Sequence, residues 1–585
     1  MELSCVSPAP IWRRHLPWLA LLLILVSFVI AVIRLHPANF FGYTEDDSIY
    51  FSSAKALAAG KGYLLASFPG APAATKYPVL YPWMLSWVWR ALPAFPANLT
   101  YAIAICVAFG ALFLTTAFFF LRRLRGIGQW EALLLTAFCA LHPLVLFYSG
   151  SVLSDIPFAA FAMGALLLAD IALERKPSDA VVVCAGLLTG LAMSMRILGL
   201  PIATGIALAF CLRRSWRSLA VFVASVMPFL GVLVWRTTFS PAPASPVSGA
   251  ASSSPAWTHT WTYYTSYIGA WKDAVPTLAV LLAMLKNNAT VLICTPGSYL
   301  ISPRPGAETL AETLLTAVIT VFAMKGILRE ARHIAWKPIH LALPFYALLV
   351  LFWNYPQSDR FFIPFLPLFA AGIWLEGKYV ANLARSSLSA NKALFQRVLA
   401  MAFCLVIASF VSAVAMNYAG GIRSASAAKS KERAALLVEK REAYRWVSRS
   451  TTADTRLTAY EDAAAYLYTG RSTIRPFTFT TEEYYEPARL RRDLDHFADV
   501  SRTVGADYWI VSDDDYDIGW GDAYVKGSMR MKQMEESLPL VFVSRFGRVR
   551  IYSLTCVNHP DGPPCQSARA ILFPAYDNVL GDNLP

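Results

Sequence analysis

Long apolar stretches alternate with short basic clusters through roughly the first two thirds of the chain. The first apolar run, residues 16–33, follows Arg13, Arg14 and His15 and is long enough to cross a membrane as a helix. No small-residue cleavage site follows it, so it is expected to be retained as the first helix and not removed as a signal peptide. Because basic residues mark the cytoplasmic ends of spans, this pattern predicts a cytoplasmic N-terminus.

The later runs obey the same rule, with two exceptions. The stretch 180–212 has basic residues at both ends, and Arg196, Gly199 and Pro201 interrupt its centre, which predicts two short helices with Arg196 at the turn. The run 277–294 would begin and end outside, which favours an interfacial amphipathic helix. Ordinary spans are expected at 101–121, 132–148, 156–173, 219–235, 310–327, 341–353, 361–374 and 399–416.

Composition agrees with this pattern. The 585 residues are 56% hydrophobic and 15% charged, with a mean hydropathy of +0.46, whereas soluble domains carry about 25% charged residues. We therefore predict a polytopic α-helical membrane protein with about eleven transmembrane helices over residues 1–416. Its outside loops are expected at 34–100 and 236–308. The net charge of +13 sits in the loops between spans, so it does not indicate nucleic-acid binding.

Two outside segments have their own character. Within 236–308 a Ser/Ala/Pro linker precedes the aromatic stretch WTHTWTYYTSYIGAW, which is expected at the lipid headgroup level. Residues 417–585 become polar, and helix-like and strand-like stretches alternate, which predicts an extracytoplasmic α/β domain ending in a hairpin across Phe546–Arg548. Cys556 and Cys565 bracket a short Pro- and Gly-containing loop, and either a disulfide in an oxidising compartment or two free thiols fits this spacing.

An adjacent acidic pair, Asp46 and Asp47, opens a helical stretch in the first outside loop. Carboxylates are favoured at a helix N-terminus, so both residues can serve as a cap. A second interpretation is that one carboxylate is a general base at a lipid-facing cleft. A further acidic run, Asp513–Asp515, could bind a cation or lie in a solvated loop.

Further ionisable residues are expected at the same membrane level as the acidic pair. Lys76 precedes a Pro- and aromatic-rich stretch, where it is either an interfacial anchor or a cation for a phosphate. Asp155, Arg196 and Arg360 each fit either helix capping or function, and ionisable groups at membrane depth are costly. Together these residues suggest a site that holds an anionic headgroup and carries out acid–base chemistry.

Five motifs in order carry a family resemblance. Residues 46–50 read DDSIY and are followed by AKALAAGKGY; KYPVLYP, VLSDIPFAAF, GLAMSMRILGLP and SDRFFIPFLPLFA come later. This series resembles segments of the GT-C fold glycosyltransferases, which include the bacterial aminoarabinose transferases and the protein O-mannosyltransferases. The resemblance implies an inverting transfer of a sugar from a polyprenyl-phosphate carrier to an acceptor glycan, lipid or protein. It also implies a multi-pass protein of the cytoplasmic (inner) membrane, with its C-terminal domain in the periplasm.

The resemblance also implies roles for individual residues. Asp46 would deprotonate the acceptor, with Asp47 as an acidic neighbour that could exchange roles with it. The donor phosphate would be held by Lys76, Arg196 and Arg360, whose fixed positive charges would stabilise the leaving group. Asp155 and Tyr50 would orient the acceptor. No motif assigns a cofactor or a set of metal ligands, although a divalent cation is compatible with the acidic residues.

Two other function classes compete with an enzyme. A transporter or flippase of lipid-linked saccharides needs polar residues through the bilayer midplane, and the spans offer few. A non-catalytic membrane scaffold would use only the C-terminal domain to bind a partner. The ionisable residues grouped at one membrane level favour the enzyme.

Overall fold

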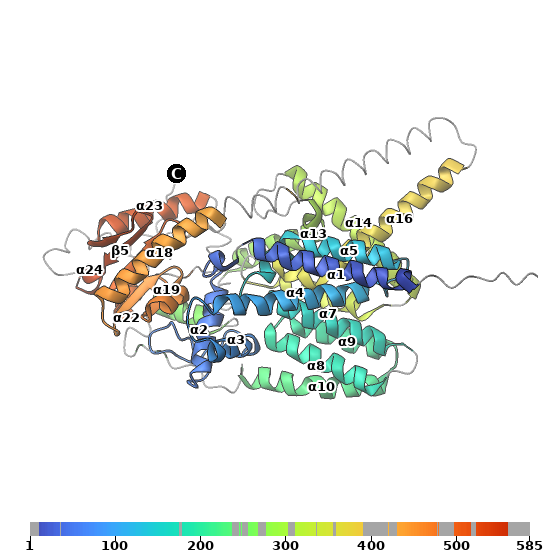
Figure 1. Ribbon diagram of the computed structural model, residues 1–585, viewed down its shortest axis with the longest axis horizontal. Coiled ribbons are helices and arrows are strands. Elements are labelled where there is room, and N and C mark those ends of the chain that lie inside the picture. The colour runs from blue at the N-terminus through green and yellow to red at the C-terminus, as the bar shows by residue number, and fades with distance from the viewer. Residues whose placement is uncertain are drawn as a thin grey trace, which may run out of the picture.

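The computed structural model shows a helical bundle with an α/β domain at one end of its long axis (Figure 1). We call this end of the bundle the domain end. Helices α2 (Asp46–Ala58) and α3 (Leu80–Ala91) lie between the bundle and the domain. The structure describes residues 11–35, 37–174, 178–236, 245, 247, 255–266, 277–301, 310–334, 336–354, 359–389, 419, 430–476, 478, 497–515 and 522–559.

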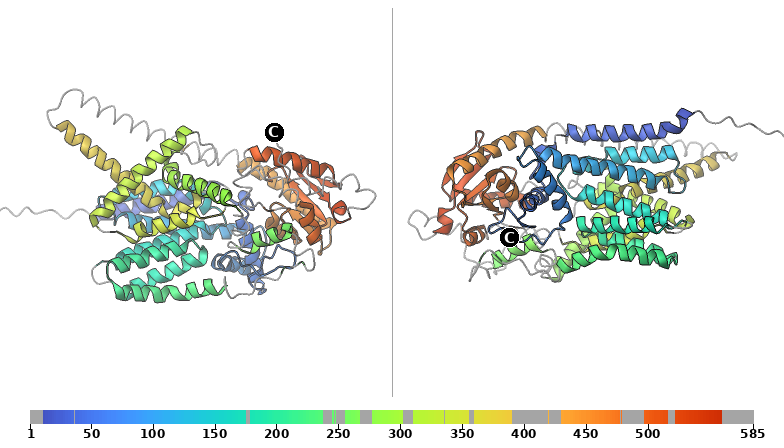
Figure 2. Two further views of the ribbon diagram at one scale, coloured as in Figure 1. Left: turned by 180° about the vertical axis from the view of Figure 1, so that it is seen from behind. Right: turned by 60° about the horizontal axis from the view of Figure 1, so that its bottom comes forward.

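Most helices of the bundle run along its long axis (Figures 1 and 2). Among the described residues, seven helices are long and apolar enough to cross a membrane, or eight if a bent pair counts as one span. The predicted span 399–416 lies outside the described residues. The long helices are α1 (Ile11–Arg34), α4 (Leu99–Leu121), α7 (Asp155–Ala172), α10 (Trp216–Val234), α13 (Leu278–Ile301), α14 (Leu310–Ile334) and α16 (Leu366–Ser389).

The single span predicted at 132–148 is broken. Helix α5 (Gln129–Leu141) and helix α6 (Pro143–Ser149) meet at an angle of 61°. Pro143 has no N–H to continue the helix and disfavours a helical conformation at His142, which is extended. The His142 ring then accepts a hydrogen bond from the Leu144 N–H at 3.2 Å, so it caps the new helix.

The predicted break at the centre of 180–212 is confirmed. Helix α8 (Asp179–Met195) ends at Arg196, which is extended, and α9 (Gly199–Leu212) begins three residues later. Helix α9 then packs on α15 (Pro338–Leu351) so closely that a Cβ on Gly205 would lie 2.4 Å from the Ala342 Cα. Glycine is required there because any side chain would push the two backbones apart.

The interfacial position expected for 277–294 is wrong. Helix α13 continues to Ile301 and packs along α14 and α15 inside the bundle. Asn288, near its middle, is buried and donates to the Leu351 and Trp353 carbonyl oxygens at 2.9 and 2.8 Å. The polar residue that suggested an interfacial helix therefore satisfies the carbonyl groups at the C-terminal end of α15.

The aromatic stretch expected at the headgroup level is also placed differently. Its described part forms α11 (Pro255–Thr265), which packs against α22 (Phe497–Val504) of the C-terminal domain. Trp257 is 1% exposed and lies against Phe68 of the first loop. These aromatic side chains are buried between protein surfaces, so they join the first loop to the domain.

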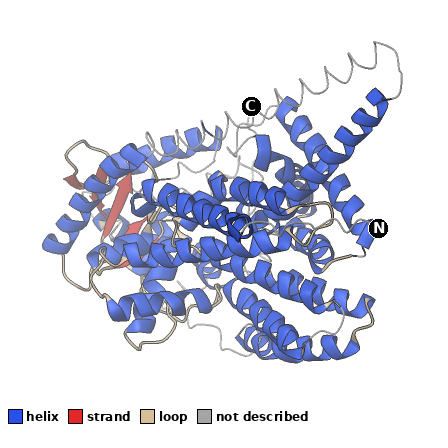
Figure 3. Ribbon diagram, turned by 45° about the vertical axis from the view of Figure 1, so that its right-hand side comes forward, coloured by secondary structure: helices blue, strands red, loops and turns tan. Residues whose placement is uncertain are grey.

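The C-terminal part of the chain contains both helices and strands, and the expected hairpin joins β4 to β5. Its described residues form a five-stranded sheet in the order β2-β1-β3-β5-β4, in which β2, β1 and β3 are parallel and the hairpin strands β4 and β5 are antiparallel (Figure 3). The strands are β1 (Arg456–Ala459), β2 (Ser472–Ile474), β3 (Tyr508–Ser512), β4 (Leu540–Val543) and β5 (Val549–Ser553). The accompanying helices are α18 (Ser430–Ser450), α19 (Asp462–Thr469), α22, α23 (Asp522–Glu536) and α24 (Thr555–Asn558).

A buried ionic cluster joins the domain to the first loop. Arg433 and Lys440 of α18 both pair with Glu461 and with Asp514. Arg433 also lies over the ring of Tyr43, three positions before the first residue of α2. The domain therefore rests on the segment that carries the acidic pair, and α19 packs on α2 beside this contact.

Candidate active site at the domain end

Asp46 is the first residue of α2, and its carboxylate has two partners from distant segments. Its Oδ2 lies 3.2 Å from Nη2 of Arg360, and its Oδ1 accepts a hydrogen bond from the Tyr77 hydroxyl at 2.7 Å. Burial raises the pKa of Asp46, but Arg360, the Tyr77 hydroxyl and Arg196 outweigh it and hold the pKa below its usual value. Asp46 is thus an ionised carboxylate in a polar setting.

A second ion pair lies beside the first. Asp155 begins α7, and its Oδ1 is 2.5 Å from Nη1 of Arg196 at the break between α8 and α9. The same oxygen lies 3.8 Å from Nε of Arg360, which belongs to the 3-10 helix η4 (Asp359–Phe365). Arg360 therefore lies between the two aspartates. Four segments far apart in sequence meet here, as the site hypothesis requires.

Aromatic side chains lie against these charges, and a small pocket adjoins Arg196. The guanidinium groups of Arg196 and Arg360 lie 5.2 and 5.6 Å from the centre of the Phe361 ring. Tyr50 packs edge-on against Tyr77, and its hydroxyl is 3.3 Å from Ser154 Oγ. The pocket is lined by Tyr50, Tyr77, Pro78, Met195, Arg196, Ile197, Leu198 and Trp353.

Lys76 lies against Tyr77 and Tyr263, close enough to Asp46 for their charges to interact. Its Nζ is 4.0 Å from the centre of the Tyr263 ring and 5.4 Å from that of Tyr77, within the range of a cation–π contact. Burial lowers the pKa of Lys76 to about 8, although Glu45 and Asp46 act to raise it. The lysine therefore carries its charge at neutral pH and loses it in mildly alkaline solution.

Asp47 does not join the cluster around Arg360. It is 2% exposed, and its two carboxylate oxygens accept from the Ser48 N–H at 2.6 Å and the Gly42 N–H at 3.0 Å. Burial raises the pKa of Asp47 to about 7 in spite of these bonds. This geometry differs from that expected of a second catalytic acid, because the carboxylate satisfies backbone groups at the start of α2.

Four residues with direct contacts at the site escaped the sequence reasoning: Tyr77, Glu45, Tyr263 and Arg475. Glu45 accepts from the Tyr263 hydroxyl at 2.8 Å and lies 2.9 Å from Nη2 of Arg475 in the C-terminal domain. Tyr77 could have been suspected because it directly follows Lys76. The other three depend on how the domain and α11 dock, for which the sequence holds no local signal.

The remaining candidates serve other purposes or are untested. Asp513 and Asp514 pair with cationic side chains of the protein, and Asp515 accepts from the Ser512 N–H at 2.8 Å. Cys556 is disulfide-bonded, and Cys565 lies outside the described residues. Within the part of the chain that the structure describes, no group of three or more His, Cys, Asp or Glu could hold a metal ion.

No protein-family model and no curated protein sequence matches the chain. Solved structures do. The archaeal oligosaccharyltransferase AglB from Archaeoglobus fulgidus, in complex with an inhibitory peptide and a dolichol-phosphate, is 14% identical, with a TM-score of 0.50 over 92% of this chain and 74% of that one. The chain has a GT-C fold.

Two further structures fall in the same fold group. The Archaeoglobus fulgidus oligosaccharyltransferase tethered with an acceptor peptide is 15% identical, with a TM-score of 0.50 over 90% of this chain and 73% of that one. ArnT from Cupriavidus metallidurans bound to undecaprenyl phosphate is 14% identical, with a TM-score of 0.46 over 90% and 97%. The GT-C fold expected from the five motifs is confirmed, and identities this low carry the fold and not the reaction.

Proposed function

We propose that this GT-C protein is an inverting glycosyltransferase that moves a sugar from a polyprenyl-phosphate carrier to an acceptor at the extracytoplasmic face of the cytoplasmic membrane. One observation carries the proposal. Arg360 lies between Asp46 and Asp155, at the domain end of a bundle of apolar helices. Buried charges from separate elements are costly to assemble, and such assemblies are typical of functional sites.

The charges of the site suit a phosphodiester. Three positive charges are present, on Lys76, Arg196 and Arg360. The carboxylates of Asp46 and Asp155 neutralise two of them, so one positive charge remains in excess. A sugar linked through a phosphodiester carries one negative charge. Its departing phosphate monoester gains a second, so fixed cations stabilise the transition state more than the bound donor.

The pocket suits a lipid-linked donor. Its lining combines the cationic Arg196 with the apolar residues Met195, Ile197 and Leu198. An isoprenoid chain requires such an apolar approach, and its phosphate requires the cation. The dolichol-phosphate reported with the AglB structure is a compound of this class.

The reaction follows from the same residues. Asp46 takes the proton from the acceptor hydroxyl or amide, and the acceptor atom forms a bond to the anomeric carbon from the face opposite the phosphate. The bond from the anomeric carbon to the phosphate oxygen breaks, and its electron pair leaves on the phosphate. Arg360 pairs with Asp46 before the donor arrives. When Arg360 turns toward the phosphate, the carboxylate becomes available as a base.

Three further residues have supporting roles in this proposal. Asp155 holds Arg196 and Arg360 in place, since its single oxygen Oδ1 contacts both. Tyr50 lines the pocket and orients the acceptor. Asp47 fixes the start of α2 and with it the direction of Asp46.

Donor preference and stereochemistry test the proposal. The full chain in lipid nanodiscs should transfer sugar from radiolabelled polyprenyl-phosphate sugars, with inversion at the anomeric carbon, and should not use the matching nucleotide sugars. Arg360→Ala should raise the KM for the lipid-linked donor far more than that for the acceptor. Use of nucleotide sugars, retention of configuration, or an unchanged donor KM in Arg360→Ala would contradict the assignment.

A further inference from the structure

The C-terminal domain reaches the site through one arginine. Arg475 follows strand β2, is 4% exposed, and places Nη2 at 2.9 Å from Glu45 Oε2. Its Nε donates to the Tyr460 carbonyl oxygen at 3.2 Å, and its guanidinium lies 4.3 Å from the centre of the Tyr460 ring. Contacts within its own domain thus hold the Arg475 side chain in the orientation in which it meets the first loop.

Glu45 receives this contact directly next to Asp46. Its second oxygen, Oε1, accepts from the hydroxyl of Tyr263 at 2.8 Å, so one carboxylate binds both the domain and helix α11. Glu45 has a positive φ of 60°, which is uncommon for a residue other than glycine. The side-chain contacts compensate for this conformation, which directs Asp46 into the site.

Helix α11 in turn holds Lys76. The Tyr263 ring lies under Nζ of Lys76 at 4.0 Å, and the Thr265 carbonyl oxygen accepts from Thr75 Oγ1 at 2.6 Å. The neighbouring Tyr264 returns to the domain, because its hydroxyl accepts from the Arg475 N–H at 3.1 Å and donates to Asp462 at 2.6 Å. Two consecutive tyrosines therefore connect the domain to the lysine.

We propose that Arg475, Glu45 and Tyr263 are positioning residues, through which the C-terminal domain sets the position and the charge of Lys76. The role of Lys76 toward a donor phosphate rests on the proposed function. The positioning of the lysine does not.

The sign of each effect follows from the charges. The negative charges of Glu45 and Asp46 raise the pKa of Lys76, and the positive charge of Arg475 lowers it. The rings of Tyr263 and Tyr77 lie against the ammonium group. Without Arg475, the Glu45 carboxylate loses its competing partner and attracts the lysine more strongly. Without the Glu45 charge, the lysine loses that attraction.

Competitive acylation of the full chain in detergent tests these signs without any enzymatic assay. The labelling of Lys76 is followed by mass spectrometry from pH 6 to 11, with the exposed Lys61 of the same loop as internal standard. Glu45→Gln should lower the pH midpoint of Lys76 labelling, and Arg475→Met should raise it, each by about one unit. Arg475→Lys should restore most of the wild-type value.

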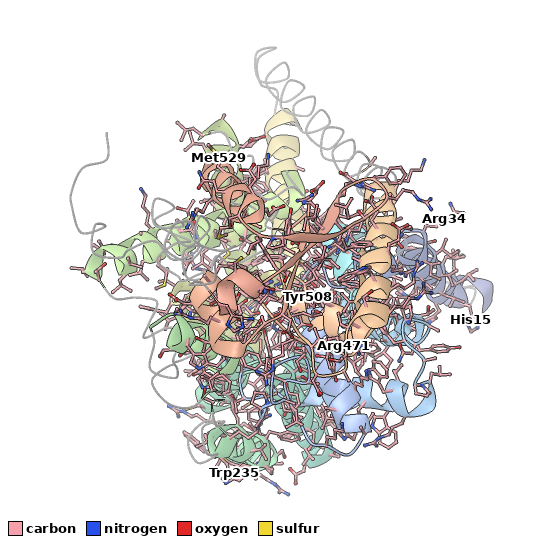
Figure 4. All side chains as sticks on the ribbon, turned by 90° about the vertical axis from the view of Figure 1, so that its left-hand side faces the viewer. His15, Arg34, Trp235, Arg471, Tyr508 and Met529 are labelled. Atoms are coloured by element: carbon pink, nitrogen blue, oxygen red, sulfur yellow. The ribbon has the colours of Figure 1, made fainter. Side chains whose placement is uncertain are left out.

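Arg471 provides the matched control. It also lies in the C-terminal domain (labelled in Figure 4) and donates to the Thr451 and Thr469 carbonyl oxygens, and its hydrogen-bond partners among the described residues all belong to this domain. Arg471→Met should leave the Lys76 midpoint unchanged. Glu45→Gln removes the charge and keeps the size of the side chain, so it tests the proposal even if Arg475→Met fails to fold.

Binding of undecaprenyl phosphate to the same variants separates the two proposals. At pH 7, Glu45→Gln should weaken binding by about twofold or more, because a fall of one unit in the pKa leaves about half of Lys76 charged. Arg475→Met keeps Lys76 charged, so it should weaken binding only through the altered position of the lysine. If the midpoints shift as expected and binding does not change, the positioning role stands and the assignment of Lys76 to the donor phosphate fails. If both variants leave the midpoint at its wild-type value, or if Arg471→Met shifts it equally, the positioning role is refuted.

Discussion

Replacing Arg196 by methionine tests the paired charges at the centre of the site. Arg196 has a side chain that is 13% exposed, and its partner Asp155 has one that is 3% exposed. The contact between Nη1 and Oδ1 is 2.5 Å, whereas the remaining cation, Arg360, is 3.8 Å from the same oxygen. Arg196→Met fills a similar volume but leaves Asp155 with a single, more distant partner.

The effects of Arg196→Met on stability and on catalysis can both be estimated from the structure. Removing one member of a buried ion pair costs about 3–5 kcal/mol, because the other charge stays buried. With an unfolding entropy of about 2 cal/mol/K per residue, that loss lowers Tm by roughly 2–4 °C for 585 residues. Removing one preorganised cation from a developing negative charge should lower kcat by about 10²–10³.

A double variant separates stability from catalysis. Arg196→Met combined with Asp155→Leu removes both charges, and an apolar pair of similar volume often restores the stability of a buried ion pair. We expect the double variant to regain most of the lost Tm in nanodiscs and to remain as inactive as the single variant. Recovery of transfer activity would refute the reasoning, since Arg196 would then serve only to neutralise Asp155. An unchanged Tm in Arg196→Met would contradict the buried pair itself.

Three other outcomes are expected. At pH values below 8, undecaprenyl phosphate should bind tightly to the wild-type protein, and its affinity should fall as the pH rises through about 8, where Lys76 loses its proton. Lys76→Arg should bind it equally well on both sides of that pH. If the pH dependence of Lys76→Arg is the same as that of the wild type, Lys76 is not part of the binding site. Asp47→Ala should cost about 1 kcal/mol of stability through the lost hydrogen bonds from the Gly42 and Ser48 N–H groups. It should lower transfer activity only in part, because Asp46 is less well positioned, whereas an inactive but equally stable variant would return a catalytic role to Asp47. Non-reducing mass spectrometry should find a peptide pair linked through Cys556 and Cys565, and a different partner for Cys556 would contradict the predicted pairing.

Features of the fold with a local cause could be predicted from the sequence. The break at Arg196 follows from Gly199 and Pro201, which fit the first turn of α9 but disfavour the interior of one continuous helix. The hairpin of β4 and β5 follows from two strand-like runs around Gly547, which has a φ of 77°. The bend at His142 has an equally local cause in Pro143, but the apolar character of the run on both sides concealed it.

Features that depend on docking could not be predicted. The aromatic residues of α11 have a composition equally suited to lipid headgroups and to a protein interface, and only the C-terminal domain decides between them. Part of the site itself could be predicted from the sequence. Asp46 and Arg360 are separated by 314 positions, yet both were recognised because charges next to apolar spans are uncommon. Arg475 sits in a polar domain among other arginines, where its sequence context gives no such contrast.

The most direct test of the account is the transfer activity of Asp46→Asn. Asparagine keeps the size of the side chain and can still accept from Tyr77, but it cannot take a proton from the acceptor. Asp454→Asn, an exposed substitution in the C-terminal domain, is the matched control. The account predicts that Asp46→Asn folds, binds undecaprenyl phosphate, and loses at least about 10² in kcat, while Asp454→Asn behaves as wild type. Wild-type turnover by a correctly folded Asp46→Asn protein would contradict the proposed mechanism.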